Sequence, residues 1–158
     1  KDNIIYKGFI FFGLMNVNGQ PKVIEYNVRM GDPETEAVIP RISSDLLNLF
    51  KGIGDGTFSE KDLYVTDDFA VTLMLVSSGY PEFYEKGKEI LGLELVNEAI
   101  VFHAGTMNNG RVETNGGRVL ALTALAKNLD GALQKVFNSA QKINFEGKYY
   151  RRDIGFDL

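Results

Sequence analysis

The sequence predicts an α+β protein in which a β-hairpin and two helices precede a run of short strands and one further helix. Three observations lead to this prediction. An Asn-Gly turn at residues 18–19 joins an apolar segment to an alternating one. Residues 69–76 are rich in β-branched and aromatic side chains. Residues 130–143 carry apolar side chains at helical spacing, which is typical of an amphipathic helix.

The first element is the hairpin. Residues 4–17 are apolar without regular alternation, which is typical of a strand buried on both faces. Residues 22–28 alternate and form the expected second strand. Because side chains of a strand point to alternate faces, one face is expected to carry four residues: Val23, Glu25, Asn27 and Arg29.

Two helices are expected next. Gly31 is free to take a positive φ, and Asp32 is expected to cap a helix over residues 33–39 with Pro33 in its first turn. Pro40 is expected to end or kink that helix. A second helix is expected to start at Ser43 or Ser44 and to stop among the glycines at residues 52–56.

The remainder is predicted to be rich in β-structure. A loop with one short strand is expected over residues 57–68, and a helix capped by Asp130 is expected to run to about residue 143. Further strands are expected at residues 69–76, 100–103, 111–113 and 118–125, with turns at 77–81, 107–110 and 115–117. A boundary near residues 55–68 separates the hairpin and helices from the β-rich remainder, which predicts two parts, residues 1–58 and 59–158.

Composition excludes several function classes. The 17 basic and 21 acidic residues give a net charge of −4, the reverse of the basic excess usual in nucleic-acid-binding proteins. Without cysteine and with a single histidine, His103, the chain cannot form disulfides, thiolate centres or multi-histidine metal sites. No apolar run approaches the roughly 20 residues that span a bilayer, and residues 1–4 lack the basic–apolar–small order of a signal peptide. We therefore expect a cytoplasmic protein with no membrane partner, and the lack of an initiator Met suggests a piece of a longer chain.

The polar face of the second strand is the first candidate site. Glu25 and Asn27 supply a carboxylate and an amide oxygen, hard ligands suited to Mg²⁺, which usually takes only one or two protein carboxylates. Arg29 is placed to form a forked contact with a phosphate oxygen. A solvent-facing strand that is polar by chance explains the same pattern, so spacing alone leaves both interpretations open.

Three further features have two interpretations each. Asn115, Gly116, Gly117 and Arg118 form either an anion-binding loop or a tight hairpin turn with an exposed arginine. The basic cluster at residues 148, 151 and 152 is either an RNA-binding edge or a solvated face, and the acidic net charge favours the second. His103 is either a substrate-facing side chain or a structural one.

Residues 22–35 resemble the signature near the end of the ATP-grasp domain in the phosphoribosylamine–glycine ligase (glycinamide ribonucleotide synthetase) family. Tyr6-Lys7-Gly8 and Gly13-Leu14-Met15 are similar to the strand that precedes this signature. Four later segments are similar to the C-terminal domain of the family: residues 102–106, 114–119, 145–147 and 150–155. The resemblance covers essentially the whole chain and implies the C-terminal portion of an ATP-grasp domain followed by a small antiparallel β-rich domain with one helix.

The resemblance also implies an activity. The family joins glycine to 5-phosphoribosylamine with ATP, through glycyl phosphate, in an early step of purine synthesis. It implies that Glu25 and Asn27 hold Mg²⁺ or Mn²⁺ on the ATP phosphates. It implies that the reacting groups face Arg29, Gly31, Asp32, Pro33 and Glu34. It makes a ribose-phosphate contact plausible for the loop at residues 115–118.

The sequence departs from the family pattern in two ways. Residues 4–22 contain no Asp or Glu, although many ATP-grasp enzymes take a further metal ligand from that strand. The N-terminal domain, the glycine-rich phosphate loop and most of the adenine pocket have no counterpart here, so we expect the isolated chain to be inactive. Two alternatives stay open at this point, another ATP-grasp carboxylate–amine ligase and a non-catalytic β-rich binding module.

Overall fold

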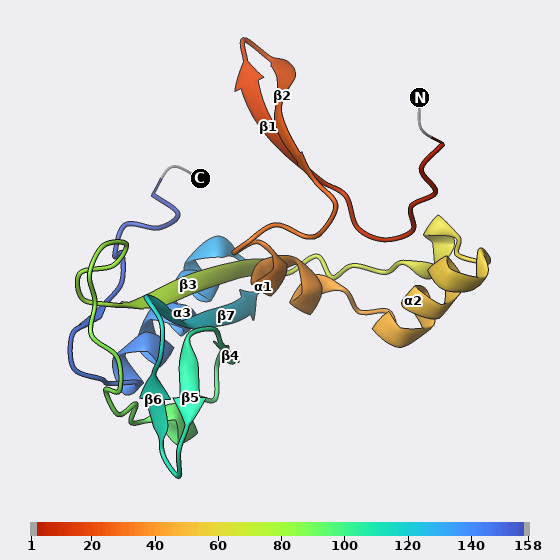
Figure 1. Ribbon diagram of the computed structural model, residues 1–158. Helices are drawn as coiled ribbons and strands as arrows, with labels where there is room; N and C mark the ends of the chain where they lie inside the picture. The colour runs from red at the N-terminus through yellow and green to blue at the C-terminus, as the bar shows by residue number, and fades with distance from the viewer. Residues whose placement is uncertain (1–2, 157–158) are drawn as a thin grey trace. The chain divides into compact units, whose positions relative to one another are not determined.

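The computed structural model describes residues 3–156 and divides into two compact units, Lys1–Thr66 and Asp67–Leu158 (Figure 1). Each unit is considered by itself. Together they contain short antiparallel sheets and three α-helices, which confirms the predicted α+β class. No helix in the described part of the chain has the length and apolar character needed to cross a bilayer.

The first unit begins with the hairpin, formed by β1 (Phe11–Val17) and β2 (Gln20–Asn27). Asn18 and Gly19 both have positive φ, 52° and 80°, as the tight turn of a two-residue hairpin requires. The prediction of a hairpin is therefore confirmed.

The hairpin strands are not buried on both faces as expected. The first strand starts at Phe11 instead of Ile4, and most side chains of β1 and β2 are exposed, including Leu14 at 56 % and Tyr26 at 65 %. A two-stranded ribbon can cover neither of its faces without a further layer, so apolar composition alone does not ensure burial.

A β-bulge changes the predicted faces of β2. Gly13 pairs with Glu25, but Leu14 pairs with Val23, so Ile24 is an extra residue on β2. Since paired residues share a face and Gly13 and Leu14 lie on opposite faces, the bulge separates Val23 from Glu25. The prediction that alternation joins these two residues on one face is wrong.

The first helix starts later than predicted. Helix α1 (Thr35–Val38) has Glu34 at its N-cap with no side-chain cap, so Asp32 is not the capping residue. Thr35 instead donates from Oγ1 to the Gly31 carbonyl at 2.6 Å. The helix then tightens into a 3₁₀ turn, η1 (Ile39–Arg41), which has Pro40 in its first turn.

Helix α2 (Leu46–Asp55) is capped by Asp45, whose carboxylate accepts from the Asn48 amide at 2.8 Å. The helix therefore starts later than the predicted Ser43 or Ser44, and the Ser44 hydroxyl is used elsewhere. It donates to the Asp62 carbonyl and accepts from the Tyr64 amide, both at 2.7 Å. Those bonds join α2 to the following chain, where η2 (Glu60–Asp62) and a single bridge between Ile42 and Val65 replace the expected short strand.

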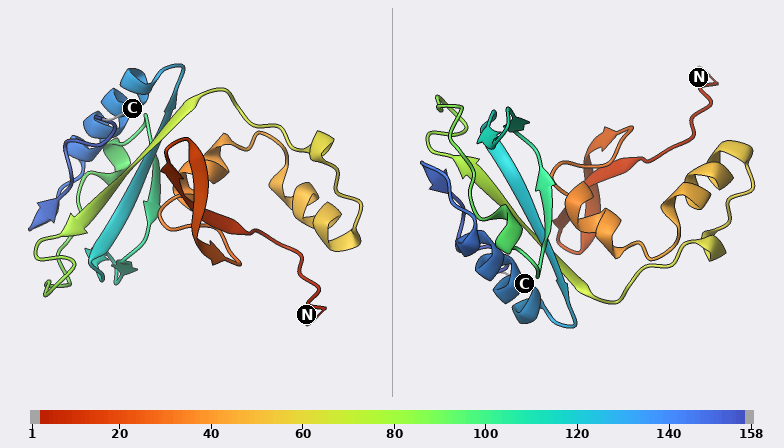
Figure 2. Two further views of the ribbon diagram at one scale, coloured as in Figure 1. Left: turned by 90° about the horizontal axis from the view of Figure 1, so that it is seen from above. Right: turned by 90° about the horizontal axis from the view of Figure 1, so that it is seen from below.

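The second unit is built on a four-stranded antiparallel sheet in the order β4-β7-β3-β8. Its strands are β3 (Phe69–Ser77), β4 (Ile100–His103), β7 (Arg118–Ala126) and β8 (Lys148–Tyr149). Helix α3 (Leu129–Lys142) packs against β7 and β3 (Figures 1 and 2), and its buried residues join those of the two central strands in one core. The strands predicted at 69–76, 100–103 and 118–125 are thus confirmed to within one residue at each end.

Three details of the second unit differ from prediction. Strands β5 (Thr106–Asn108) and β6 (Val112–Thr114) form a small hairpin, so the predicted turn at 107–110 is partly strand. A short 3₁₀ turn, η3 (Leu93–Leu95), lies between β3 and β4, where no element was predicted. Asn128 caps α3, accepting from the Gly131 amide at 2.7 Å, and Asp130 lies in the first turn.

Candidate metal and phosphate sites

Glu25 and Asn27 lie on one face of β2, opposite Gly13 and Phe11 of β1. Glu25 is exposed and Asn27 is half-buried. A Cβ atom added to Gly13 would lie 2.9 Å from Glu25 Cγ, closer than carbon atoms normally approach. The glycine therefore leaves the space that the Glu25 side chain occupies, and the sequence analysis did not find this role for Gly13.

The donor set on this face fits a magnesium or manganese ion. Among the described residues, no group of three or more His, Cys, Asp or Glu side chains is placed to hold a metal. The shared face of Glu25 and Asn27 offers one carboxylate and one amide oxygen, which would leave phosphate and water to complete a six-coordinate shell. This is the usual division for Mg²⁺ bound with a nucleotide.

Arg29 lies beyond the end of β2, in a bend at residues 28–29. Its guanidinium donates from Nη1 to the neighbouring Met30 carbonyl at 2.9 Å. Strand alternation therefore fixes the faces of Glu25 and Asn27 but does not extend to Arg29.

The turn at residues 31–34 is shaped by Gly31, although not in the predicted way. Gly31 is buried and its φ is not positive. A Cβ atom there would lie 3.0 Å from Phe11 Cε2 and would overlap the Glu34 carboxylate. The glycine therefore lets Glu34 fold back over the turn, while Asp32 and Pro33 are exposed.

The loop at residues 115–117 in the second unit packs backbone to backbone against the loop that follows β4. The Asn115 amide donates to the Gly105 carbonyl at 2.7 Å, and a Cβ atom on Gly105 would lie 2.7 Å from Gly116 Cα. Arg118 begins β7 and is half-buried. The two glycines thus serve close packing, and neither adds a side chain next to Arg118.

His103 ends β4, close to the same loops. Its Nδ1 lies 2.9 Å from Thr106 Oγ1, and its side chain is exposed. This hydrogen bond engages Nδ1 and holds the imidazole ring at the turn between β4 and β5.

Two residues of the basic cluster near the C-terminus, Lys148 and Arg151, form contacts within the second unit. Lys148 Nζ donates to the Ala140 carbonyl at 2.9 Å and also to the Ile143 carbonyl, so its ammonium group caps the C-terminal end of α3. Burial lowers the pKa of Lys148. Arg151 forms a two-point contact with Asp153, with both distances 2.9 Å. These contacts favour the solvated, ion-paired interpretation over an RNA-binding edge.

Another ion-pair cluster lies on the second unit. Lys88 Nζ is 2.8 Å from Glu85 and 3.0 Å from Glu146. The hydrogen bonds that Lys88 donates to Glu85 and Glu146 raise the pKa of Lys88, and the bond that Glu85 accepts from Lys88 lowers the pKa of Glu85. Two carboxylates neutralise one ammonium here, so the cluster does not attract an anion.

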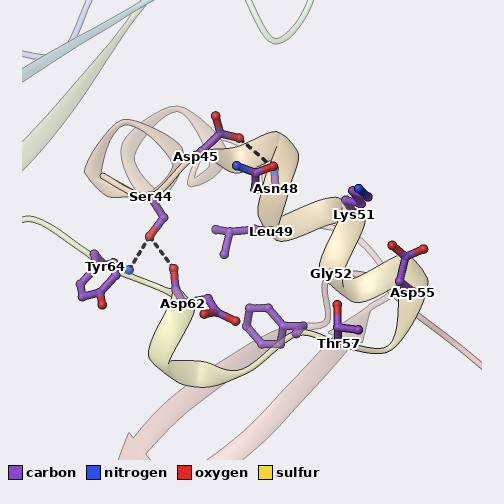
Figure 3. Close-up of a pocket in the computed structure, with 11 residues that line it drawn as sticks. Ser44, Asp45, Asn48, Leu49, Lys51, Gly52, Asp55, Thr57, Asp62 and Tyr64 are labelled. Carbon is purple, nitrogen blue, oxygen red and sulfur yellow. Dashed lines mark hydrogen bonds between the residues drawn. The ribbon is translucent and has the colours of Figure 1, made fainter.

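A pocket of about 500 Å³ lies within the first unit, between α2 and the chain at residues 57–64 (Figure 3). Leu49 points into it, whereas the charged ends of Lys51 and Asp55 point away from it (Figure 3). None of the residues predicted from the sequence as site residues lines this pocket. The residues that line the pocket therefore do not include those of the Glu25–Asn27 face.

Two family models match the chain. The C domain of phosphoribosylglycinamide synthetase matches residues 70–157, and the ATP-grasp (A) domain of the same family matches residues 1–35. The phosphoribosylamine–glycine ligase of Caldanaerobacter subterraneus is 43 % identical over 155 residues, which are 98 % of this chain and 37 % of that protein. The trifunctional purine biosynthetic protein adenosine-3 of Gallus gallus is 42 % identical over 99 % of this chain and 16 % of its own length.

Solved structures agree with these matches. The phosphoribosylamine–glycine ligase of Thermotoga maritima superposes with a TM-score of 0.80 at 39 % identity, covering 91 % of this chain and 36 % of that one. The biotin carboxylase of Campylobacter jejuni superposes with a TM-score of 0.58 at 13 % identity, covering 94 % of this chain and 34 % of that one, which shows a shared fold only. The chain thus spans about a third of the single-function ligases that it matches.

Proposed function

The chain belongs to the phosphoribosylglycinamide synthetase family, and we propose that it is the C-terminal part of a phosphoribosylamine–glycine ligase. The observation that carries this proposal is the polar face of β2, where Glu25 and Asn27 lie together and Gly13 makes room for the carboxylate. The parent enzyme would use ATP to join glycine to 5-phosphoribosylamine, giving glycinamide ribonucleotide, ADP and phosphate.

In this proposal, the first unit supplies part of the phosphoryl-transfer site. Glu25 and Asn27 would hold Mg²⁺ or Mn²⁺, which neutralises the charge on the ATP phosphates. Arg29 and the turn at residues 31–34 would face the glycine carboxylate as it accepts the phosphoryl group. These groups act by position and charge, because phosphoryl transfer needs little covalent chemistry from the protein.

The second unit would help to bind the amine substrate, 5-phosphoribosylamine. Asn115, Gly116, Gly117 and Arg118 would contact the phosphate of 5-phosphoribosylamine, whose amine then displaces phosphate from the activated glycine. The assignment of residues 1–58 to the ATP-grasp domain and of 59–158 to the C-terminal domain belongs to the same proposal, as does a cytoplasmic location of the parent.

Steady-state assays of the parent protein test the function. We expect ADP and phosphate release only when ATP, glycine and 5-phosphoribosylamine are all present. Replacement of glycine by another small amino acid separates this ligase from other ATP-grasp carboxylate–amine ligases, and equal turnover with such a substitute would reject the glycine assignment. A parent with no ATP turnover under any of these conditions would favour the non-catalytic module.

The isolated 158-residue chain provides a second test. We expect it to release no phosphate from ATP in the presence of glycine, because the upstream parts that the family uses to hold the nucleotide are missing from it. Turnover by the purified chain above a buffer blank would contradict this expectation.

A further inference from the structure

The last residue of β3, Ser77, holds the loop at residues 115–117 from one side. The backbone amide of Ser77 donates to the Gly117 carbonyl at 2.8 Å, and Ser77 Oγ donates to the Gly116 carbonyl at 3.0 Å. Ser77 is only 5 % exposed, so both bonds are shielded from water. One buried serine thus fixes the direction of two consecutive peptide groups in the loop.

The direction of those peptides determines what the loop presents. In a planar trans peptide, the N–H points away from the carbonyl of the same peptide group. Because the Gly116 carbonyl points to Ser77, the amide of Gly117 points to the opposite side of the loop. An amide held in this way beside an arginine suits an anion such as a phosphate.

Tyr80 holds the same loop through shape. A Cβ atom on Gly117 would lie 2.8 Å from Cε2 and 3.0 Å from Cγ of the Tyr80 ring, so the ring packs directly on the glycine. The φ angle of Gly117 is not in the left-handed region. The ring of Tyr80, and not the backbone conformation, is therefore what requires glycine at this position.

We propose that Ser77 and Tyr80 are positioning residues that hold the loop at 115–117 in the conformation that receives the phosphate of a ribose 5-phosphate group. This inference rests on the proposed function, because it assigns the substrate contact of the same enzyme. It adds two residues outside the loop and explains why the loop carries glycine at position 117.

A double-mutant cycle in the parent protein tests the role of Tyr80. The readout is the Kd of ribose 5-phosphate, measured by calorimetry, which does not depend on turnover. We expect Gly117→Ala to weaken binding about tenfold or more, because the new methyl group displaces the loop from the Tyr80 ring. Tyr80→Ala in the same chain removes the obstacle, so the double variant should bind no more weakly than Tyr80→Ala alone.

Controls separate positioning from general stability. Tyr80→Phe keeps the ring and should bind ribose 5-phosphate as the wild type does, and the Kd of ATP should stay unchanged in every variant. If the Kd of ribose 5-phosphate in the double variant rises by the product of the two single-variant increases, the proposal is overturned. Equal weakening of ATP and ribose 5-phosphate binding would also overturn it, since that result indicates a structural role only.

The role of Ser77 is tested by comparing Ser77→Ala with Ser78→Ala. Ser77→Ala should weaken ribose 5-phosphate binding about tenfold, because it removes the donor to the Gly116 carbonyl. Ser78→Ala changes an exposed serine one residue away and should leave binding unchanged. A wild-type parent that does not bind ribose 5-phosphate overturns this inference, whereas a parent that binds it but does not turn over glycine overturns only the proposed function.

Discussion

Replacement of Gly13 by alanine tests whether the space opposite Glu25 serves metal binding. The added Cβ would lie 2.9 Å from Glu25 Cγ, whereas such carbon atoms normally approach to about 3.5–4.0 Å. The Glu25 side chain must therefore move by roughly 1 Å or leave its rotamer, which costs about 0.5–1.5 kcal/mol. If the metal-bound state bears this cost, the affinity for Mg²⁺ falls about two- to twelvefold.

The assay is the Mg²⁺ dependence of glycine-dependent ADP formation by the parent enzyme. We expect Gly13→Ala to shift the half-saturating Mg²⁺ concentration upward while the protein stays folded, because alanine restricts the unfolded chain more than glycine does. Gly54→Ala is the matched control, since a Cβ atom there meets nothing within 4 Å and its φ is ordinary. An unchanged Mg²⁺ dependence in Gly13→Ala, or an equal shift in the control, would refute the assignment of Glu25.

Three further predictions concern the second unit and are measured by urea or thermal unfolding with a probe in that unit. Leu75 is fully buried beneath α3, so Leu75→Ala should lower the free energy of unfolding by about 3–5 kcal/mol; a loss below 1 kcal/mol would contradict the packing. Asn128→Ala should lower the free energy of unfolding by about 1 kcal/mol because it removes the cap of α3, and Asp130→Ala should lower it clearly less. The reverse order would contradict this assignment and favour Asp130, the cap predicted from the sequence. Burial lowers the pKa of Lys148 in the folded state, so the folded protein loses that proton at a lower pH than the unfolded chain does. The free energy of unfolding should therefore rise as the pH increases from the folded to the unfolded pKa of Lys148. Lys148→Met should lack this rise, and a rise of equal size in the variant would contradict the prediction.

Elements with strong local signals were predictable from the sequence. The Asn18-Gly19 turn requires positive φ at two consecutive residues, a conformation that few other dipeptides adopt readily, and it defines the hairpin without reference to the rest of the chain. Strands β3 and β7 combine high β-propensity with flanking turns, and both were placed to within one residue. The shared face of Glu25 and Asn27 was predictable for the same reason, since their separation along the strand is a local property.

Other features depend on contacts between distant segments, and the sequence misplaced them. Ser44 has the chemistry of a helix cap, but its hydroxyl bonds to the chain at residues 62–64, so Asp45 caps α2. The bulge at Ile24 depends on the register between two strands, which alternation within one strand cannot reveal. The burial of β1 was overestimated because composition indicates apolarity and does not indicate whether another layer is present.

The order of elements, the α+β class and the choice of Glu25 and Asn27 as candidate metal ligands followed from the sequence alone, because turn chemistry, strand alternation and ligand chemistry are encoded within a few neighbouring residues. The tertiary structure decided how those residues are supported. It showed that Gly13 provides space for Glu25, that Gly117 is required by the Tyr80 ring, and that Lys148 caps a helix. Each of these roles is a steric or hydrogen-bonded contact between segments that only the folded chain brings together.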